Sequence, residues 1–583
     1  MTSDRATAAD DWIDRVGRLG RVDLAAIAIV VISTLLRLPA VFTSFFWQPD
    51  LAHLTEARSD RIGGSQLVHA DGTGPLAAAT TWLVSRLGAW TYVPAGLLLL
   101  LLEAVASALL WLALRRLYGA RPAALVPLGV AALTPASVAA LTWLTGGLLV
   151  VLPQVCLSLG VLGLLGFAAS RGELRTWWAL AVLLAHVACV LSGAMGLLFL
   201  PALVLVRFAI GLSAVRDAAR LPSRGSVLVF WIPQVVVSAG AFALYLGATD
   251  VSSAAVSPSW WRVFLPSLIG APFSNRGATE SAYPYTPAGW SWAVVAVLLV
   301  LLLASVVVGR LRSGLVWLCA VLLVAGATLV VAGWPTSVGT AYDAAELTAV
   351  LPVALLIVSL AFTRRRPTNS ARDQRRRSRA LAPVLAVPVL LTLVVALPMN
   401  VVFGDTFSHL DAASYARHLH AGLKADRSRS LRNAALPDSV AADTDLRGLF
   451  TAMGERPVLD QPSAQLWVVD DSGAVVSGRL RDATVTQGPR RKCGWLVDGN
   501  PTRVLASADG AAPVIRLDYY SGSDGLLTVT RAGTTQSAAV NDRLGSTYVT
   551  LPGVPGPVTV RFEEADGPMC LVKVLEGEPW PAG

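Results

Sequence analysis

Residues 45–75 read FFWQPDLAHLTEARSDRIGGSQLVHADGTGP, a polar stretch that directly follows the first apolar segment of the chain. Its candidate functional side chains are Trp47, Asp50, His53, Glu56, Arg58, Asp60, His69 and Asp71. Carboxylates grouped in this way suit the removal of a proton from a hydroxyl group, or metal-assisted phosphate chemistry. The alternative is a solvated loop that exposes its charges to water.

The rest of the sequence is dominated by apolar runs. Only 15% of the 583 residues are charged and the mean hydropathy is +0.59, whereas a soluble protein carries about 25% charged residues. Several runs reach about 20 residues, the length needed to cross a bilayer. The sequence therefore predicts an α-helical polytopic membrane protein with about 11 transmembrane helices. The predicted spans are 23–43, 92–114, 122–142, 147–169, 176–192, 194–212, 226–248, 290–309, 314–332, 345–363 and 380–401.

The charges are distributed unevenly along the chain. Residues 402–583 carry 18 Lys and Arg against 21 Asp and Glu, so the positive excess lies in the first 401 residues. It lies in alternate short loops, and the loop 364–379 alone contains eight arginines and one acid. The positive-inside rule assigns these loops to the cytoplasm. This pattern indicates topology in the plasma membrane and gives no reason to expect a nucleic-acid partner.

The same rule predicts the domain organisation. Residues 1–22 form a cytoplasmic tail and 23–401 a transmembrane domain, with outer loops at 44–91 and 249–289. Residues 402–460 form a helical linker outside the cell, and 461–583 an extracytoplasmic β-sandwich of jelly-roll type. The sandwich is indicated by short alternating runs such as VIRLDYY and VTVRFEE, separated by Gly, Asp and Pro turns.

Several polar residues outside the first loop are candidates for a role. Arg262 and Arg276 lie in an outer loop rich in aromatic residues and suit phosphate binding; interfacial anchoring is the alternative. Glu103 and His186 lie within spans, where charge is costly, and are expected to bond to each other or to other helices. Cys493 and Cys570 lie in the oxidising exterior, which predicts a disulfide between them.

Phrases spread over nearly the whole chain resemble actinobacterial membrane proteins of the GT-C superfamily. These are integral-membrane glycosyltransferases that use polyprenyl-phosphate-linked sugars. The phrases are FFWQPDLAHL (45–54), HADGTGPLAAATTWLVSRLGAW (69–90), VFLPSLIGAPF (263–273), KCGWLV (492–497) and MCLVKVLEGEP (569–579). In the family, an acidic residue or pair of the first outer loop helps to deprotonate the acceptor or to bind a metal. Here the pair position reads Pro49–Asp50, so one carboxylate carries over.

The resemblance implies transfer of a sugar from a polyprenyl-phosphate donor to an envelope polysaccharide outside the cell. Asp50 is the expected base, assisted by Asp71, His69 or Glu56. Arg58, Arg262 or Arg276, with Trp47, are expected to bind the donor, and the resemblance leaves a divalent metal open.

Two other functions remain open. One is an inactive GT-C-like protein that binds glycan or acts as a scaffold in envelope assembly. The other is a transporter or flippase that uses Glu103 and His186.

Overall fold

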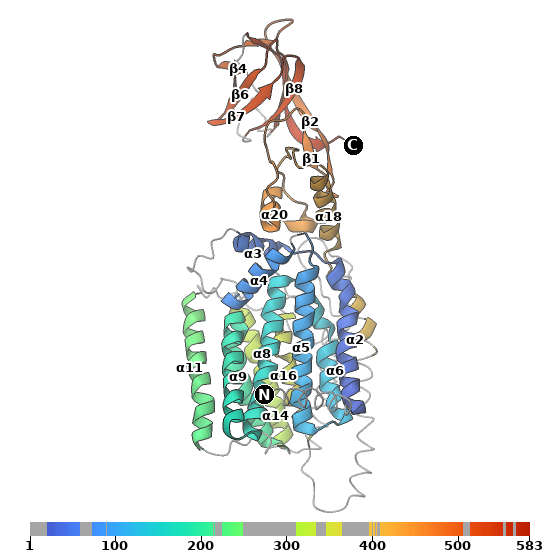
Figure 1. Cartoon of the computed structure of the whole chain (residues 1–583), viewed down its shortest axis with the longest axis vertical. Coiled ribbons are helices and arrows are strands. Elements are labelled where there is room, and N and C mark those ends of the chain that lie inside the picture. The colour runs from blue at the N-terminus through green and yellow to red at the C-terminus, as the bar shows by residue number, and fades with distance from the viewer. Residues whose placement is uncertain are drawn as a thin grey trace, which may run out of the picture. The chain divides into compact units, whose positions relative to one another are not determined.

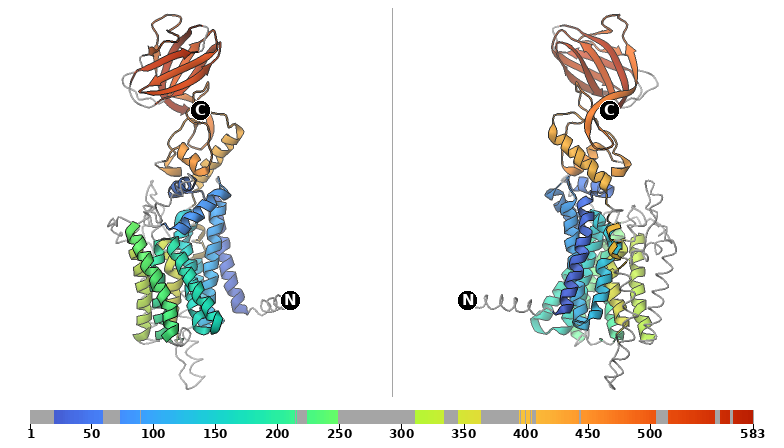
Figure 2. Two further views of the ribbon diagram at one scale, coloured as in Figure 1. Left: turned by 60° about the vertical axis from the view of Figure 1, so that its left-hand side comes forward. Right: turned by 90° about the vertical axis from the view of Figure 1, so that its right-hand side faces the viewer.

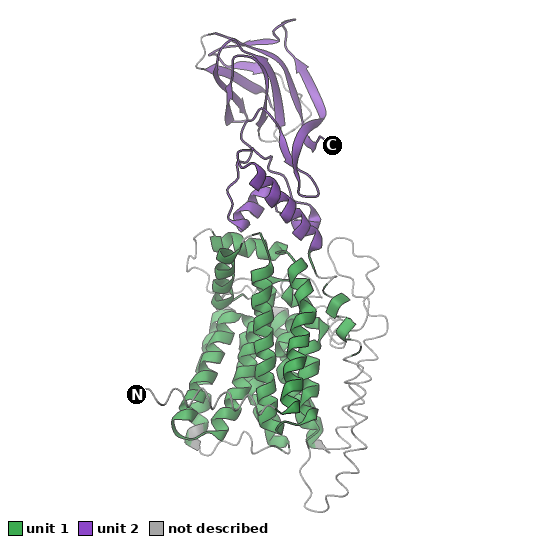
Figure 3. Ribbon diagram, turned by 45° about the vertical axis from the view of Figure 1, so that its right-hand side comes forward, with its two compact units in different colours: residues 1–409 green, residues 410–583 purple. Residues whose placement is uncertain are grey.

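The computed structural model divides into two compact units, Met1–His409 and Leu410–Gly583, which are shown in different colours in Figure 3. It describes residues 20–58, 73–88, 90–213, 215, 224–248, 311–333 and 345–363 of the first unit, and 394, 396–398, 400–402, 404, 408 and 409 near its end. In the second unit it describes residues 410–442, 444–504, 514–551, 556–563 and 567–582.

The first unit is a bundle of apolar helices (Figures 1 and 2). Its elements are α2 (Arg21–Thr43), α3 (Gln48–Arg58), α4 (Pro75–Leu87), α5 (Val93–Tyr118), η1 (Pro122–Ala124), α6 (Leu125–Leu133), η2 (Pro135–Ser137), α7 (Val138–Leu141), α8 (Leu144–Ala169), α9 (Gly172–Ser192), η3 (Ala194–Leu198), α10 (Phe199–Leu212), α11 (Arg224–Ala248), α14 (Leu311–Gly333), η5 (Leu347–Val350) and α16 (Leu351–Ala361).

The protein is a multi-pass membrane protein. Eight helical segments of the described residues are long and apolar enough to cross a bilayer, and Leu347–Ala361 is a shorter apolar helix. They correspond to nine of the predicted spans. The predicted span 290–309 lies outside the described residues, and 380–401 lies largely outside them.

Helix α8 is the centre of the bundle, because most of its side chains are buried and it contacts α5, α9 and α10. Gly147 lets it pack closely, since a Cβ at this position would meet the carbonyl oxygen of Ala140. The preceding span is broken where the sequence places proline: Pro122 and Pro135 each begin a short 3-10 turn. Proline lacks an amide hydrogen, so it suits the first turn of a helix and ends the one before it.

A buried ion pair joins α2 to α5. Arg37 donates to Glu103 at 2.6 Å, and their side chains are 1% and 9% exposed. Arg37 also donates to the Oδ1 atom of Asn400 (3.0 Å) and to the carbonyl oxygen of Thr134 (2.7 Å). Glu103 therefore pairs with another helix, α2, which is the second of the two expected alternatives, and not with His186.

His186 belongs to a second polar cluster in the bundle. Its Nδ1 atom lies 2.8 Å from the Oε1 atom of Gln234, and its Nε2 atom lies 3.3 Å from the hydroxyl of Ser238. Both partners are on α11. These contacts join α9 to α11. Glu103 and His186 therefore have separate partners and do not form the shared polar path that a transporter function would use.

The second unit begins with helices and continues as strands. Its elements are α18 (Leu410–Ala425), α19 (Asp438–Ala441), α20 (Leu446–Met453), β1 (Trp467–Val469), β2 (Val475–Gln487), β3 (Trp495–Val497), β4 (Thr502–Val504), β5 (Val514–Tyr520), β6 (Gly525–Arg531), β7 (Thr534–Val540), β8 (Leu544–Thr550), β9 (Val558–Glu563) and β10 (Met569–Pro581).

The strands form two antiparallel sheets. One has the order β1-β2-β10-β5-β8 with β3 beside β10, and the other has the order β4-β9-β6-β7. Inward-facing residues of both sheets, such as Leu517, Val529 and Val560, share one buried core. This is the predicted β-sandwich. Alternate burial along β6 and β9 explains why these runs were recognisable, whereas β5 is buried along most of its length.

Two covalent or ionic links fasten the sandwich. The predicted disulfide between Cys493 and Cys570 is confirmed. Arg531 of β6 pairs with Glu576 of β10 inside the core, so a buried ion pair joins the two sheets.

Candidate functional site

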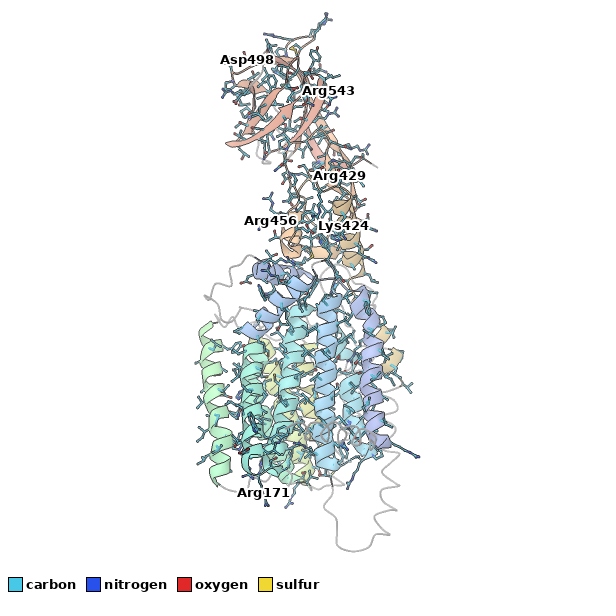
Figure 4. The ribbon with its side chains drawn as sticks, viewed as in Figure 1. Arg171, Lys424, Arg429, Arg456, Asp498 and Arg543 are labelled. Atoms are coloured by element: carbon cyan, nitrogen blue, oxygen red, sulfur yellow. A yellow bond between two sulfur atoms is a disulfide. The ribbon has the colours of Figure 1, made fainter. Side chains whose placement is uncertain are left out.

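The described part of the first polar loop folds as two helices at one end of the bundle. Figure 1 shows α3 and α4 there, and α4 contacts α3, α5, α8 and α9. Arg171, at the junction of α8 and α9, lies at the opposite end of the bundle (Figure 4). The loop that the sequence singles out therefore covers one end of the spanning helices.

Asp50 lies in the first turn of α3 and is fully buried, with 0% of its surface exposed. Its Oδ1 atom accepts hydrogen bonds from the amide and the hydroxyl of Thr145, both at 2.9 Å. Its Oδ2 atom accepts from the amides of Leu144 (3.1 Å) and Trp47 (3.3 Å). Each carboxylate oxygen thus receives two donors.

These contacts make Asp50 the acceptor for the first amides of α8. A helix begins with amides that have no partner inside the helix, and negative charge is favoured beside them. Trp143, which precedes α8, has no capping side chain, and Asp50 supplies the oxygen from another helix. Burial raises the pKa of the Asp50 carboxyl, and the donated hydrogen bonds oppose this rise.

Aromatic rings lie beside Asp50. The indole of Trp47 packs edge-on against Trp143 (5.8 Å between ring centroids) and stacks on the imidazole of His409 at the same distance. Burial lowers the pKa of His409 to about 4, so its ring is neutral at pH 7. Its Nε2 atom is buried without a hydrogen-bond partner among the described residues. Trp47 and His409 thus form a rigid stack next to the capping carboxylate.

The other candidates on α3 have different settings. Glu56 is exposed. Arg58 is half-buried, and its Nη2 atom donates to the carbonyl oxygen of Ser85 on α4. Arg58 therefore ties the end of α3 to α4.

The phrase Thr73-Gly74-Pro75 fixes the start of α4. Thr73 forms a β-bridge with Gly193, and the amide of Gly74 donates to the carbonyl oxygen of Ser192 at 3.3 Å. Pro75 occupies the first turn of α4, where a missing amide hydrogen costs nothing. Gly74 is required by this close approach, because a Cβ there would meet the carbonyl oxygen of Leu191.

We expect Gly74→Ala to separate α4 from the end of α9. The added methyl group overlaps backbone atoms, which cannot rotate away, and overpacking of this kind costs about 1–3 kcal/mol. The full-length protein in detergent should unfold at a lower temperature than wild type. Gly211→Ala is the matched control, because a Cβ there meets only the far end of the Arg207 side chain. Equal midpoints for both variants would contradict the role of Gly74.

Five of the candidate residues lie outside the described residues: Asp60, His69, Asp71, Arg262 and Arg276. Within the described part of the chain, no three His, Cys, Asp or Glu residues come together as metal ligands. Both oxygens of Asp50 are occupied by N–H and O–H donors, so the residues present around it do not fit a divalent metal.

The sequence gives Asp50 and Trp47 but not their partners. Thr145, Trp143 and His409 come from positions 93 or more residues away. Trp143 and Thr145 fall between two predicted spans, and His409 falls in the predicted linker 402–460. One signal was available: Trp143 and Thr145 flank the start of a helix that has no capping side chain of its own. The free amides at such a helix start need acceptors from outside the helix, and a carboxylate is one group that can supply them.

No family model and no curated protein matches the chain. Two solved structures are similar to it at 14% identity. An oligosaccharyltransferase of Archaeoglobus fulgidus in the apo form has a TM-score of 0.34, with 66% of this chain and 56% of that one covered. Arabinosyltransferase EmbB from Mycobacterium smegmatis has a TM-score of 0.29, with 97% and 65% covered. This chain spans less than two thirds of either protein. Both are named as sugar transferases, and the function proposed below rests on this chain's own residues.

Proposed function

We propose that the protein is a membrane glycosyltransferase that moves a sugar from a polyprenyl-phosphate donor to an envelope glycan on the outer side of the membrane. One observation carries the proposal. The described part of the first polar loop, α3 and α4, packs on the end of the bundle, and Asp50 anchors α3 to the buried helix α8. Polar helices held in this way would place ionisable groups of the loop near the level at which a lipid-borne head group lies.

The proposed roles of the loop residues follow from the setting of Asp50. Asp50 is a positioning residue, because all four of its hydrogen bonds are already taken by the protein. Proton removal from the acceptor hydroxyl is then assigned to Asp71, assisted by His69, with Glu56 on the exposed side of α3 as the alternative. Arg58, Arg262 and Arg276 remain the proposed partners of the phosphate leaving group, which gains negative charge as the bond breaks.

The Trp47 indole suits contact with the sugar or with the prenyl chain. It is half-buried and held by Trp143 and His409, so it loses little freedom on binding.

Transfer of labelled sugar tests the proposal. Full-length protein in proteoliposomes is given a panel of labelled polyprenyl-phosphate sugars and an envelope glycan acceptor. Asp71→Asn is expected to lower the rate by about 100- to 10,000-fold, the usual contribution of a general base. Glu173→Gln, which removes one exposed carboxylate of α9 outside this loop, is the control and should keep the rate of wild type.

The outcomes are distinct. Equal rates for Asp71→Asn and wild type remove Asp71 from the mechanism. Absence of product with every donor of the panel, from protein that remains monodisperse, contradicts the enzymatic function.

Glycan binding without turnover is the second candidate, and the outward face of the six-stranded sheet favours it. Tyr520, 56% exposed, continues into a polar network in which Asp518 accepts from Arg516 (2.7 Å) and pairs with Lys573 (3.2 Å). Burial raises the pKa of the Asp518 carboxyl, but hydrogen bonds from Ser546 and Arg516 outweigh it, so the pKa is lowered and the group is ionised. Saturable retention of glycan by the same proteoliposomes, without product, would assign this function.

A further inference from the structure

Helix α4 exposes an apolar face that the described residues do not cover. Trp82, Leu83 and Leu87 are 37%, 50% and 64% exposed, and Ala79 lies on the same side. Ala77, Thr81, Val84 and Ser85 are buried against the bundle. The exposed side chains of α4 are thus mostly apolar, and the side chains that face the protein are mostly small or polar. This is the reverse of a helix that lies on a water-facing surface.

This face continues a surface that meets lipid. The span α9 exposes Trp177, Leu180, Leu184 and Leu191 at helical spacing, as expected for a helix that lies against acyl chains. Leu191 is in the last turn of α9, where its carbonyl oxygen lies against Gly74. The backbone contacts of Thr73 and Gly74 therefore set the start of α4 directly beside the end of this stripe.

The one charged residue on the exposed face is Arg86. Its guanidinium lies over the indole of Trp82, 5.4 Å from the ring centroid. An arginine beside a tryptophan is typical of the boundary between acyl chains and head groups, because the ring stays in the apolar layer and the cation reaches the phosphates. The positive charge also complements the phosphate of a phospholipid.

We propose that α4 lies in the lipid–water interface of the leaflet that faces the first polar loop. Trp82, Leu83 and Leu87 lie among the upper acyl-chain carbons, and Arg86 binds lipid phosphate. The occupant of this face is the phospholipid monolayer itself. The inference goes beyond the proposed function, because it holds whether or not the protein transfers sugar. It also places Arg58 and Ser85, which join α3 to α4, at the depth of the head groups.

Site-directed labelling of the full-length protein in lipid nanodiscs tests the placement. Leu83→Cys and Leu87→Cys are each coupled to an environment-sensitive fluorophore. Cys156, Cys189 and Cys319 are buried and the other two cysteines form the disulfide, so the label goes to the introduced thiol. Leu184→Cys on α9, 60% exposed, is the lipid control, and Leu544→Cys in the sandwich, 72% exposed, is the water control.

Both α4 labels should emit at shorter wavelength than Leu544→Cys. A nitroxide attached near the lipid head group should quench them more strongly than iodide in the buffer does. Labels that behave like Leu544→Cys, red-shifted and quenched by iodide, would overturn the proposal. Quenching that is strongest with a nitroxide at the end of the acyl chain, as for a buried span, would also overturn it, because α4 would then lie below the interface.

The role of Arg86 has its own readout. With Leu83→Cys as reporter, a nitroxide carried by an anionic lipid should quench more than the same nitroxide on a zwitterionic lipid. Arg86→Gln should bring the two values together, whereas Arg86→Lys should keep them apart. No difference between the lipids with Arg86 in place would contradict the phosphate contact.

Discussion

Glu103→Leu is expected to destabilise the membrane unit by about 3–5 kcal/mol, the cost of removing one partner of a buried ion pair. Arg37 is 1% exposed, and its partner carboxylate lies at 2.6 Å. Without Glu103, the guanidinium keeps a full charge in the bundle with only Asn400 and the Thr134 carbonyl as acceptors. The loss should appear as a lower temperature at which full-length protein in detergent stops eluting as a monodisperse species.

Removing both charges separates the cost of an unpaired charge from the cost of lost packing. The double variant Arg37→Met, Glu103→Leu should recover a large part of the stability lost in Glu103→Leu, because no buried charge remains. Glu578→Gln breaks the exposed pair with Arg481 and is the control, with an expected effect of about 0–1 kcal/mol. A double variant less stable than Glu103→Leu would contradict this account of the pair.

The spans and the sandwich were predictable because burial produces recognisable apolar patterns in the sequence. Long apolar runs gave the membrane helices. Strands such as β6 and β9, in which buried residues alternate with more exposed ones, indicated the sheets. β2 and β7 were missed, since most of their residues are exposed or half-exposed and they show no clear apolar alternation.

The sequence predicted single polar residues inside the bundle but not the pairs that they form. Glu103 and His186 stood out as ionisable groups within apolar runs, but the partner of each depends on which helices become neighbours. Arg37 lies near the end of its apolar run, where a long side chain can reach the surface, but helix packing buries it. No local pattern encodes such a choice, because the contact joins positions 66 residues apart in the pair Arg37–Glu103 and 48 apart in His186–Gln234.

The sequence identified Asp50 as a candidate site residue but did not predict its burial or its hydrogen-bond partners. The pattern placed it in an outer loop, where a solvent-facing base was expected. The structure buries it completely against the start of α8. The Asp50 carboxylate holds α3 to the bundle. Any catalytic role of the loop depends on this anchoring.

Asp50→Asn is expected to be strongly destabilising. The amide retains one acceptor oxygen for Thr145, but its NH2 group must face the amide hydrogens of Leu144 and Trp47. Two buried donors are left without an acceptor at about 1–3 kcal/mol each, so the total cost is about 4 kcal/mol. A base that only receives a substrate proton would behave differently, because replacing it commonly leaves stability unchanged or raises it.

The most direct test of the anchoring role is the thermal unfolding midpoint of full-length Asp50→Asn, measured beside wild type and Glu56→Gln. Glu56 lies on the same helix and is exposed, so Glu56→Gln controls for the loss of one negative charge on α3. The anchoring role predicts a midpoint about 5 °C or more below wild type for Asp50→Asn and an unchanged midpoint for Glu56→Gln. A midpoint for Asp50→Asn equal to or above that of wild type would contradict it.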